Sequence, residues 1–452
     1  MIESKMVESV AKQVNIQQDV RSFECVTTDS RKQAKHALFI PLVGDRFNGH
    51  HYLQAAIDSG ATGSIWQEDE PIPTWLPADF QLYFVENSLV ALQKLAQVYR
   101  DAVNPYVIGI TGSNGKTTTK DIVFQLLGGE PYVHRTAGNL NNHIGLPLTL
   151  LSMSRDCKFA VVEMGMNHAG EISLLSKLAR PDLGIVTNIG EAHIEHLGSR
   201  EGIAKAKMEM LDGLKPNGAL VMDGDEPLLE SFQQQETISI GFGAAATETI
   251  SDVKQTNEGY TFSFLGESFW HLPLLGKHNV KNAAYGMWIA QRLGVPDSLI
   301  KARLAQTAIT GMRLERVEGP EGSIFINDAY NANPSSMKAA IETVKSMSGF
   351  HKRIAVLGDI YELGPDEEAL HRSVAEAIDA PITDVICVGE KAFWIYDELK
   401  KQHGSVAIDY VEKVEDVAAL IRPHLKHDTV VLLKASRRLA LEQVLSAVKG
   451  GA

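Results

Sequence analysis

Short hydrophobic runs recur along the chain and alternate with polar stretches that have helical spacing. In the middle of the chain these runs occupy residues 107–110, 159–164, 184–189 and 219–222. In the last third they occupy residues 324–326, 354–357, 385–388 and 430–433. Strands that are apolar on both faces and alternate with helices are typical of a largely parallel sheet covered by helices. The pattern therefore predicts an α/β fold with two successive units of this kind.

The chain has a different texture before residue 103 and again after residue 238. Residues 68–77 are rich in proline and acidic side chains, which predicts a loop, and Asn104-Pro105 ends a helical run at 88–100. Alternating apolar and polar residues at 260–264 predict an antiparallel hairpin inserted at the end of the middle region of the chain. For 452 residues we therefore expect three domains, at 1–102, 103–313 and 314–452.

The chain is acidic, with 56 Asp and Glu against 43 Lys and Arg and a formal net charge of −13. This balance argues against a protein that coats nucleic acid, but a small anion needs only a few local cations and N–H groups. Cys25, Cys157 and Cys387 are far apart, so we expect a reduced, cytoplasmic protein, and we expect a monomer. We expect no signal peptide, because the N-terminus carries charges where a signal peptide needs an apolar run. No apolar run approaches the roughly 20 residues of a membrane span.

The most specific local motif is Gly-Ile-Thr-Gly-Ser-Asn-Gly-Lys-Thr-Thr-Thr at residues 109–119. A strand pattern enters it, and a helical run at 117–127 leaves it. Gly112 and Gly115 allow a loop whose backbone N–H groups point inward, and the N-terminus of the helix adds its dipole. This combination predicts a loop that binds phosphate groups.

Two side chains in the loop fit the phosphates of a nucleotide. Lys116 can reach the β- and γ-phosphates, and the hydroxyl of Thr117 can bind Mg²⁺. Ile110 stands where the usual GxxxxGK[ST] pattern has a glycine, so a chance Gly-Lys-Thr turn is the simpler alternative. The strand before the loop and the helix after it favour phosphate binding.

Two later strands end in residues that can bind a metal ion. Residues 159–163 end in Glu163, and the run at 184–193 ends in a loop with His193. Ligands of open α/β sheets bind beyond the carboxyl ends of the strands, so both residues would lie near the phosphate loop. Carboxylate is a hard ligand for Mg²⁺, whereas histidine is an unusual one. A strand-end charge and a hydrogen-bonding histidine are the simpler alternatives, and the shared placement favours a metal site.

Lys207 lies on the apolar side of a predicted helix at residues 201–214. The apolar stripe of this helix consists of Ile203, Ala206, Met210, Leu211 and Leu214. One interpretation is a lysine that extends from the edge of the stripe into solvent. The other is a desolvated lysine with a lowered pKa. A neutral amine can take up carbon dioxide as a carbamate, which would bind metal as a carboxylate does.

Taken together, these motifs resemble the Mur ligase family, whose members are ATP-dependent amide-bond-forming enzymes of peptidoglycan synthesis. The matching runs are 111–118, Glu163, 187–193 and 204–207, and the family's shorter phosphate loop accounts for Ile110. The resemblance covers essentially the whole chain. It implies an N-terminal domain for the UDP-sugar, a central ATPase domain with a mostly parallel sheet, and a Rossmann-like C-terminal domain, which close around the substrates.

Within the family, the chain is most similar to the class that joins D-alanyl-D-alanine to UDP-N-acetylmuramoyl-tripeptide. The runs that support this are 28–31, 138–147, 328–334, 358–364 with His371, and 434–437. The class that adds the third peptide residue carries an Asp-Asn-Pro-Arg motif, whereas here Asn333-Pro334 is followed by Ser335. Asn333 and Pro334 are also a favourable helix start, which predicts a helix at 335–344 with Asp328 and Asn331 in the loop before it.

The resemblance also implies roles for individual residues. ATP would contact Gly112, Ser113, Asn114, Gly115, Lys116, Thr117, Thr118, Asn282, Arg313, Asp328 and Asn331. Magnesium ions would be bound by Thr117, Glu163, His193 and carbamylated Lys207, the last being an N6-carboxylysine. Substrates would contact Ser30, Arg31, Asn139, Asn141, Asn142, Asp359, Glu362, His371, Lys434 and Arg437. The groups assigned to catalysis are Lys116, Lys207 and His193. Arg313 lies in Gly311-Met-Arg-Leu, where the family usually has Gly-Arg directly.

The implied reaction begins when the tripeptide carboxylate attacks the γ-phosphate of ATP to give an acyl phosphate. The amine of D-alanyl-D-alanine then attacks the acyl carbon, and phosphate leaves. Two alternatives stay open. One is another amide ligase of the same fold, either the third-residue class or a folylpolyglutamate synthase. The other is a phosphate-loop ATPase that acts on a protein partner.

Overall fold

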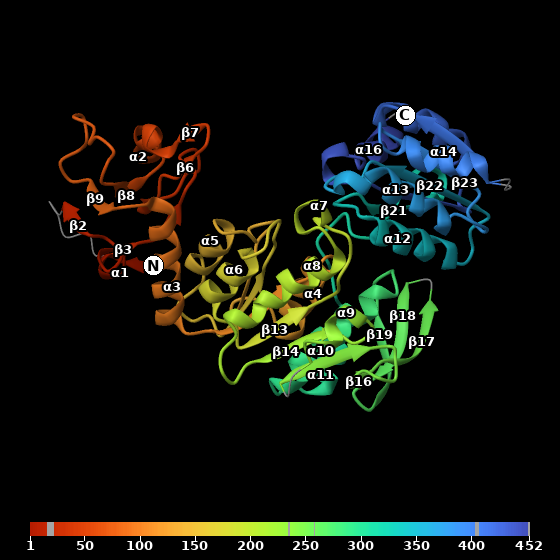
Figure 1. Ribbon diagram of the computed structural model, residues 1–452, viewed down its shortest axis with the longest axis horizontal. Coiled ribbons are helices and arrows are strands. Elements are labelled where there is room, and N and C mark those ends of the chain that lie inside the picture. Colours follow the sequence, from red (N-terminus) through yellow and green to blue (C-terminus); the bar gives the residue numbers. More distant parts are fainter. Residues whose placement is uncertain (16–21, 234–235, 257, 403–405, 451–452) are drawn as a thin grey trace.

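The computed structural model describes residues 1–15, 22–233, 236–256, 258–402 and 406–450. It contains three α/β units in chain order, with the N-terminal unit (red) and the C-terminal unit (blue) at opposite ends of the central one (Figure 1). This is the predicted three-domain α/β architecture. The proposed limits after residues 102 and 313 fall at the end of α3 (Ser88–Val103) and just before β20 (Glu315–Glu318), and they stay a prediction.

The central unit is built on a seven-stranded parallel sheet in the order β11-β12-β10-β13-β14-β15-β16. Its strands are β10 (Tyr106–Thr111), β11 (Val133–Arg135), β12 (Phe159–Glu163), β13 (Leu183–Val186), β14 (Ala219–Asp223), β15 (Thr237–Gly241) and β16 (Glu248–Thr249). The four hydrophobic runs predicted between residues 107 and 222 form β10, β12, β13 and β14, so that prediction is confirmed. Their carboxyl ends lie at one edge of the sheet, where the polar residues that follow them meet.

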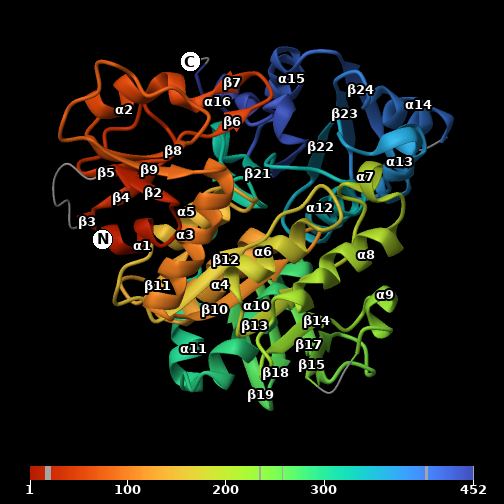
Figure 2. The same cartoon turned by 60° about the vertical axis from the view of Figure 1, so that its left-hand side comes forward.

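Helices cover both faces of the central sheet, as Figures 1 and 2 show. They are α4 (Lys116–Leu126), α5 (Gly145–Leu151), α6 (Glu171–Ala179), α7 (Ile194–Leu197), α8 (Arg200–Met208), α9 (Pro227–Glu230), α10 (His278–Arg292) and α11 (Asp297–Leu304). The helix predicted at 201–214 is shorter than expected. After α8 the chain tightens into a 3-10 turn at Glu209–Asp212, and Met210 is still buried there.

The alternating stretch at 260–264 lies in the middle strand of a three-stranded antiparallel sheet. The predicted two-stranded hairpin therefore missed one strand. These strands are β17 (Ser251–Thr256), β18 (Gly259–Phe264) and β19 (Glu267–Leu272). Tyr260, Phe262 and Phe264 of β18 are buried, whereas Thr261 and Ser263 are partly exposed. The outer strand β17 has no buried residue, so its sequence carries no alternating signal.

The N-terminal unit has a five-stranded sheet in the order β2-β9-β8-β5-β4, in which only β2 is antiparallel to its neighbour. Its strands are β2 (Gln13–Asn15), β4 (Cys25–Thr27), β5 (Ala37–Phe39), β8 (Ala61–Gln67) and β9 (Gln81–Val85). Two small pairs join β1 (Ile2–Glu3) to β3 (Ser22–Phe23) and β6 (Val43–Gly44) to β7 (Phe47–Asn48). The helices are α1 (Ser4–Glu8), α2 (Leu53–Asp58) and α3.

The C-terminal unit has a six-stranded sheet in the order β20-β21-β25-β22-β23-β24, with only β20 antiparallel. Its strands after β20 are β21 (Ile324–Asp328), β22 (Lys352–Gly358), β23 (Asp384–Val388), β24 (Ala407–Val411) and β25 (Thr429–Lys434). Its helices are α12 (Pro334–Ser346), α13 (Glu367–Arg372), α14 (Phe393–Lys401), α15 (Val414–Ile421) and α16 (Gln443–Lys449). The four hydrophobic runs predicted here are confirmed as strands.

The predicted helix start at Asn333-Pro334 is confirmed. Asn333 caps α12 by accepting a hydrogen bond from the N–H of Ser336 at 2.8 Å, and the hydroxyl of Ser336 accepts one in return from the N–H of Asn333. Pro334 occupies the first helical position, where its missing N–H costs nothing. Asp328 is the last residue of β21 and not a loop residue as predicted, while Asn331 does lie in the loop.

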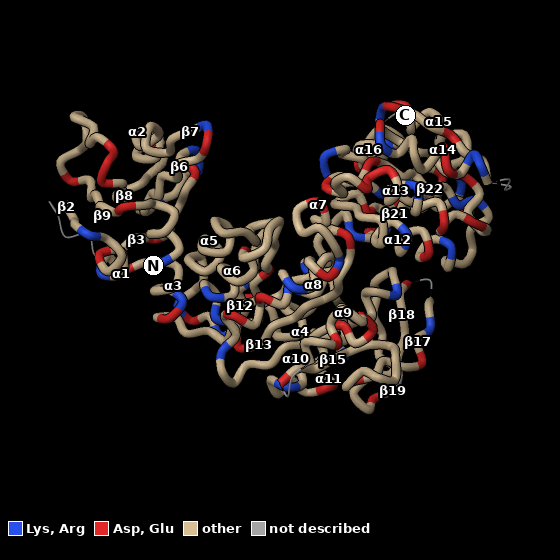
Figure 3. Tube along the Cα trace, viewed as in Figure 1, with Lys and Arg blue, Asp and Glu red and all other residues tan. Residues whose placement is uncertain are grey.

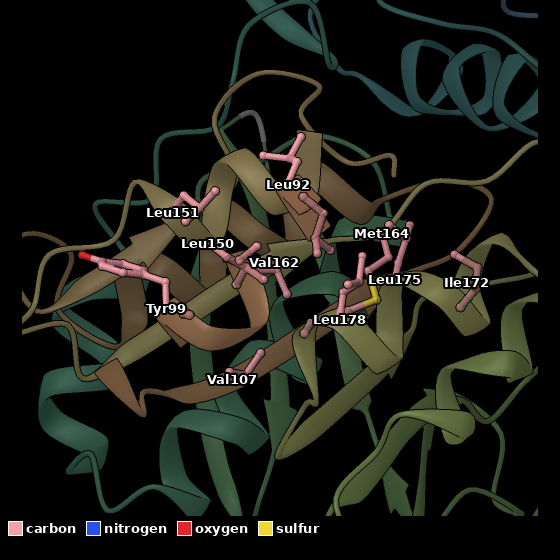
Figure 4. Close-up of a cluster of buried hydrophobic side chains, with 14 of the residues drawn as sticks. Leu92, Tyr99, Val107, Leu150, Leu151, Val162, Met164, Ile172, Leu175 and Leu178 are labelled. Atoms are coloured by element: carbon pink, nitrogen blue, oxygen red, sulfur yellow. The ribbon is translucent and has the colours of Figure 1, made fainter. Parts of the chain in front are cut away.

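The N-terminal and central units share one hydrophobic core. Leu92 and Tyr99 of α3 are buried in the same cluster as Leu150 of α5 and Leu175 of α6 (Figure 4). The two cores of the C-terminal unit consist almost entirely of residues after Leu314. The N-terminal and central units are therefore joined through one core. The C-terminal unit has its own cores and follows them in the chain after the segment around residues 305–314.

We expect Leu92→Ala to lower the free energy of unfolding of this shared core by about 2–5 kcal/mol, because it removes a fully buried side chain and leaves a cavity. Denaturant unfolding followed by circular dichroism would measure the change. Val90→Ala, at an exposed position of the same helix, is the matched control and should change stability by less than about 0.5 kcal/mol. Equal stability of the two variants would contradict a core shared through α3.

Basic and acidic residues are interspersed along all three units in the view of Figure 3. Within the described part of the chain, no helix has both the length and the apolar character required to span a membrane.

Candidate active site

A cleft of about 640 Å³ lies where the central and C-terminal units meet. Its walls combine the carboxyl ends of central strands with the start of α12 and the end of β25. The predicted site residues that line it are Ser113, Asn114, Gly115, Lys116, Thr117, Thr118, Asn139, Asn141, Asn142, Glu163, His193, Asn282, Arg313, Asp328, Asn331 and Lys434. The structure thus brings together residues that are more than 300 positions apart in the sequence.

The phosphate loop depends on its two glycines. Gly112 has φ +148°, and a Cβ there would lie 1.8 Å from the hydroxyl oxygen of Thr187. Gly115 has φ +80°, and a Cβ there would lie 2.7 Å from the side-chain oxygen of Asn282. Both glycines therefore permit a backbone conformation and a close approach that no other residue allows.

The loop is held from one side by the segment that follows β13. The N–H groups of Ser113 and Asn114 donate to the carbonyl and side-chain oxygens of Asn188, at 3.1 and 2.9 Å. Thr187 donates from its hydroxyl to the carbonyl oxygen of Asn114 at 2.5 Å. Because these two N–H groups are occupied, the donors left for an anion are those at the start of α4, which have no acceptor within the helix.

Lys116 bends back over the loop in this conformation. Its ammonium donates to the carbonyl oxygen of Gly112 at 2.8 Å. Burial lowers the pKa of Lys116; the carboxylate of Glu163 opposes that shift, and the positive charge of Arg313 adds to it. Lys116 and Arg313 therefore place two cations close enough to repel each other, and an anion between them would relieve that repulsion.

Thr117, Glu163 and Arg313 form a connected group at the floor of the cleft. The hydroxyl of Thr117 donates to one carboxylate oxygen of Glu163 at 2.8 Å and accepts from a guanidinium nitrogen of Arg313 at 2.9 Å. The other oxygen of Glu163 accepts from the side-chain amide of Asn141 at 2.8 Å. The side chain of Glu163 is buried, so these bonds compensate for the loss of water around its charge.

Arg313 reaches the phosphate loop despite the extra residue before it. Met312 and Leu314 on either side have φ +62° and +51°, and this turn directs the Arg313 side chain toward Thr117. Its guanidinium carbon stands 4.1 Å from the centre of the Tyr330 ring. The buried Nε of Arg313 has no hydrogen-bond partner among the described residues. An unpaired buried donor of this kind fits a negatively charged ligand.

Lys207 is buried, with 1% of its surface exposed. No hydrogen bond or ion pair of its ammonium is found within the described part of the chain. Burial, and secondarily the nearby charge of Lys116, lower the pKa of Lys207 well below its ordinary value. Of the two interpretations of this lysine, extension into solvent is wrong, and desolvation with a lowered pKa is supported.

His193 lies on the cleft wall and is turned toward the C-terminal unit. Its Nδ1 is 2.8 Å from a carboxylate oxygen of Glu362, and this pairing lowers the pKa of Glu362. Across the described residues, no three His, Cys, Asp or Glu side chains come together as a set of metal ligands. Glu163 and His193 alone therefore do not make a complete set of metal ligands, and a cation here would need further donors.

The predicted substrate residues of the C-terminal unit fall into two groups. Lys434 lines the cleft and binds the carboxylate of Asp328 at 2.7 Å and the carbonyl oxygen of Asn331 at 2.8 Å. Asp359 and His371 are buried outside the cleft and bind backbone. Asp359 accepts from the N–H groups of residues 391 and 392, while His371 accepts from the N–H of Ile360 at 3.1 Å. These two residues hold the 359–363 segment in place, and neither faces the cleft.

The remaining predicted residues lie toward the edges. Asn142 lines the cleft and also caps α5, since its side-chain oxygen accepts from the N–H of Gly145 at 2.8 Å. Arg437 is outside the cleft and pairs with Glu442. Ser30 and Arg31 belong to the N-terminal unit, where the exposed guanidinium of Arg31 binds Asp29 and holds the pKa of that carboxyl to about 2.

The cleft residues that sequence reasoning missed include Asn188, Tyr330, and the pair of Asp223 with Lys281, whose charged atoms are 2.7 Å apart. A signal for Asp223 was present, because this acid ends a wholly buried strand at the same sheet edge as Glu163. Asn188 and Tyr330 lie inside motifs already identified, but nothing local distinguishes them from their neighbours.

Comparison with known proteins agrees with this geometry. The family model "Mur ligase middle domain" matches residues 110–290, and "Mur ligase, glutamate ligase domain" matches residues 312–437. The UDP-N-acetylmuramoyl-tripeptide–D-alanyl-D-alanine ligase of Bacillus subtilis is 42% identical over 422 residues, which cover 93% of this chain and 92% of the relative. The chain belongs to the Mur ligase family.

Solved structures extend the likeness of this Mur ligase to all three units. A MurF crystal structure from Acinetobacter baumannii superposes with a TM-score of 0.88 at 28% identity and covers 99% of this chain and 98% of that chain. The MurF ligase of Thermotoga maritima in complex with ADP has a TM-score of 0.83 at 28% identity and covers 94% of this chain and 97% of that chain.

Proposed function

We propose that this Mur ligase joins D-alanyl-D-alanine to UDP-N-acetylmuramoyl-tripeptide at the expense of ATP, through an acyl phosphate. The observation that carries the proposal is the bond from Arg313 to Thr117, at 2.9 Å, which brings the segment between the two units onto the phosphate loop. The name of the Bacillus subtilis relative and the ADP in the Thermotoga maritima structure support the choice of substrates.

The proposed nucleotide site uses the start of α4, Lys116 and Arg313. The first N–H groups of the helix and its dipole favour phosphate oxygens. The unpaired Nε of Arg313 supplies a further donor. Asn282, which touches Gly115, and Asp328 and Asn331 across the cleft complete the proposed ATP contacts.

The oxygen atoms of Thr117 and Glu163 are hard donors that fit a magnesium ion. Together with His193 and a carbamylated Lys207 they form the proposed metal-binding set. When bound there, the ion would neutralise charge on the phosphates and orient them for transfer.

In the proposed reaction, both reactants of the first step are anions. Lys116 and Arg313 offset the charge that collects as the tripeptide carboxylate attacks the γ-phosphate. The amine of D-alanyl-D-alanine then attacks the acyl carbon, the amide bond forms, and phosphate leaves. Holding three substrates in line is mainly a task of orientation, which suits a cleft whose walls come from separate units.

Other roles follow the same arrangement. Ser30 and Arg31 would meet the uridine end, and Asn139, Asn141 and Asn142 the sugar-peptide arm. Lys434, Glu362 and Arg437 would position the last substrates. Asp359 and His371 would act there only indirectly, through the segment they hold.

An assay of phosphate release tests the function. We expect the enzyme to turn over ATP only when UDP-N-acetylmuramoyl-tripeptide and D-alanyl-D-alanine are both present. Single amino acids with UDP-N-acetylmuramoyl-dipeptide, or glutamate with a folate, are the matched substrate controls and should give no turnover. Turnover with a control pair would point to another ligase of the family, and turnover stimulated by a protein partner alone would exclude the proposal.

A further inference from the structure

Asp121 is a buried carboxylate outside the cleft, and it lies one helical turn beyond Thr117 on the same face of α4. One of its oxygens accepts hydrogen bonds from the N–H of Thr310 at 2.9 Å and from the Thr310 hydroxyl at 2.7 Å. The other accepts from the guanidinium of Arg135 at 2.7 Å. Since Thr310 lies just three residues before Arg313, Asp121 ties the segment between the units directly to α4.

The other end of this segment is tied to the C-terminal unit. The N–H of Leu314 donates to Asp328 at 3.1 Å, and the N–H of Met312 donates to Glu315 at 2.8 Å. Between these anchors Met312 and Leu314 both adopt positive φ, a conformation that costs non-glycine residues free energy. Such a backbone persists only where its surroundings hold it, and on the central side the bonds from Thr310 to Asp121 hold it together with the bond from Arg313 to Thr117.

We propose that Asp121 is a positioning residue for Arg313. By fixing Thr310 to α4, it sets where the strained turn begins and so keeps the guanidinium of Arg313 over Thr117. The inference rests on the proposed function, because it assigns Asp121 an effect on phosphate transfer that operates through Arg313. Without the anchor, the turn relaxes and Arg313 leaves its place, while the phosphate loop itself stays folded.

A double-mutant cycle separates positioning from simple stabilisation. We expect Asp121→Ala to lower kcat for phosphate release about tenfold and to raise the KM for ATP no more than Arg313→Ala does, because the start of α4 and Lys116 still bind the phosphates. In an Arg313→Ala background, where there is no guanidinium to misplace, the same substitution should lower kcat less than about twofold. Equal losses in the two backgrounds would overturn the proposal.

Two further variants address folding and charge. Thr310→Ala removes one of the two bonds to Asp121 at an exposed position and should lower kcat about threefold even if Asp121→Ala folds poorly. Arg135→Gln removes the guanidinium from the other oxygen, which keeps the ammonium of Lys120 at 3.6 Å, and it should leave kcat within about twofold of wild type. A loss in Arg135→Gln as large as that in Thr310→Ala would contradict the assigned role.

Limited trypsin digestion of the ligand-free protein gives a second readout that needs no ligase activity. We expect cleavage after Arg313, identified by mass spectrometry, to be faster in Asp121→Ala than in wild type and unchanged in Arg135→Gln. Wild-type protein without ligase activity would refute the proposed function alone, and cleavage unchanged by Asp121→Ala would refute the anchor.

Discussion

Lys116→Ala should lower phosphate release by about 100- to 1,000-fold, because the loss of one cation aimed at the developing charge typically costs this much. Lys116 lies beside Arg313 and Glu163, and its pKa is already lowered by burial. Among the described residues its ammonium donates to carbonyl oxygens of the phosphate loop, which phosphate oxygens can replace. The measurement is single-turnover formation of ADP with all three substrates present.

The assigned role is specific to acyl-phosphate formation. Positional isotope exchange in ATP, measured with the tripeptide substrate and without D-alanyl-D-alanine, should vanish in Lys116→Ala. Lys94→Ala, at an exposed position of α3, should behave as wild type in both assays. Exchange that persists in Lys116→Ala would mean that another group carries the first step.

The phosphate loop and the strands could be predicted because their sequence signals are local. A strand buried on both faces of a parallel sheet must be apolar throughout, and Gly112 and Gly115 stand in one short motif, although the contacts that exclude a side chain there, with Thr187 and Asn282, are long-range. Glu163 could be predicted as a site residue because a carboxylate at the end of an otherwise apolar strand is unusual. The outer strand β17 was missed because an exposed strand needs no apolar residue.

The contacts between units could not be predicted from local pattern. Asp121 is one polar residue within a helix, and only the fold places Thr310 against it, 189 positions later. Asp359 and His371 were assigned to the substrates by the family resemblance; here they accept hydrogen bonds from backbone N–H groups, and their substrate role stays a prediction. A motif identifies which residues matter together, and tertiary packing decides which of them face the ligand.

The buried amine of Lys207 has a chemical consequence that can be tested directly. As an ammonium it would be desolvated beside Lys116, with no acceptor or counter-charge among the described residues. As a neutral amine it can attack carbon dioxide: a nitrogen–carbon bond forms, a proton goes to solvent, and a carbamate anion remains. A carbamate there would turn the repulsion from Lys116 into attraction and would add an oxygen ligand for the proposed magnesium site.

We therefore expect Lys207→Ala to lose about 100-fold or more of its ligase activity, the scale expected when a metal-binding group at a reacting phosphate is removed. Added acetate or formate should restore part of that activity, because a small carboxylate can occupy the place of the carbamate. Labelling wild-type enzyme with carbon-13 dioxide should give a carbamate signal by NMR that is absent from the variant.

Lys205→Ala is the matched control, since Lys205 lies two residues away on the same helix and is exposed. It should keep full activity, show no response to acetate and retain the carbamate signal. Lys207→Ala also removes the aliphatic part of a fully buried side chain, so its melting temperature is measured too, and rescue by acetate separates loss of the metal-binding group from loss of folding. A fully active Lys207→Ala enzyme would refute the carbamate. Loss of activity without rescue, together with no labelled carbon in the wild type, would assign Lys207 to the site as a plain amine.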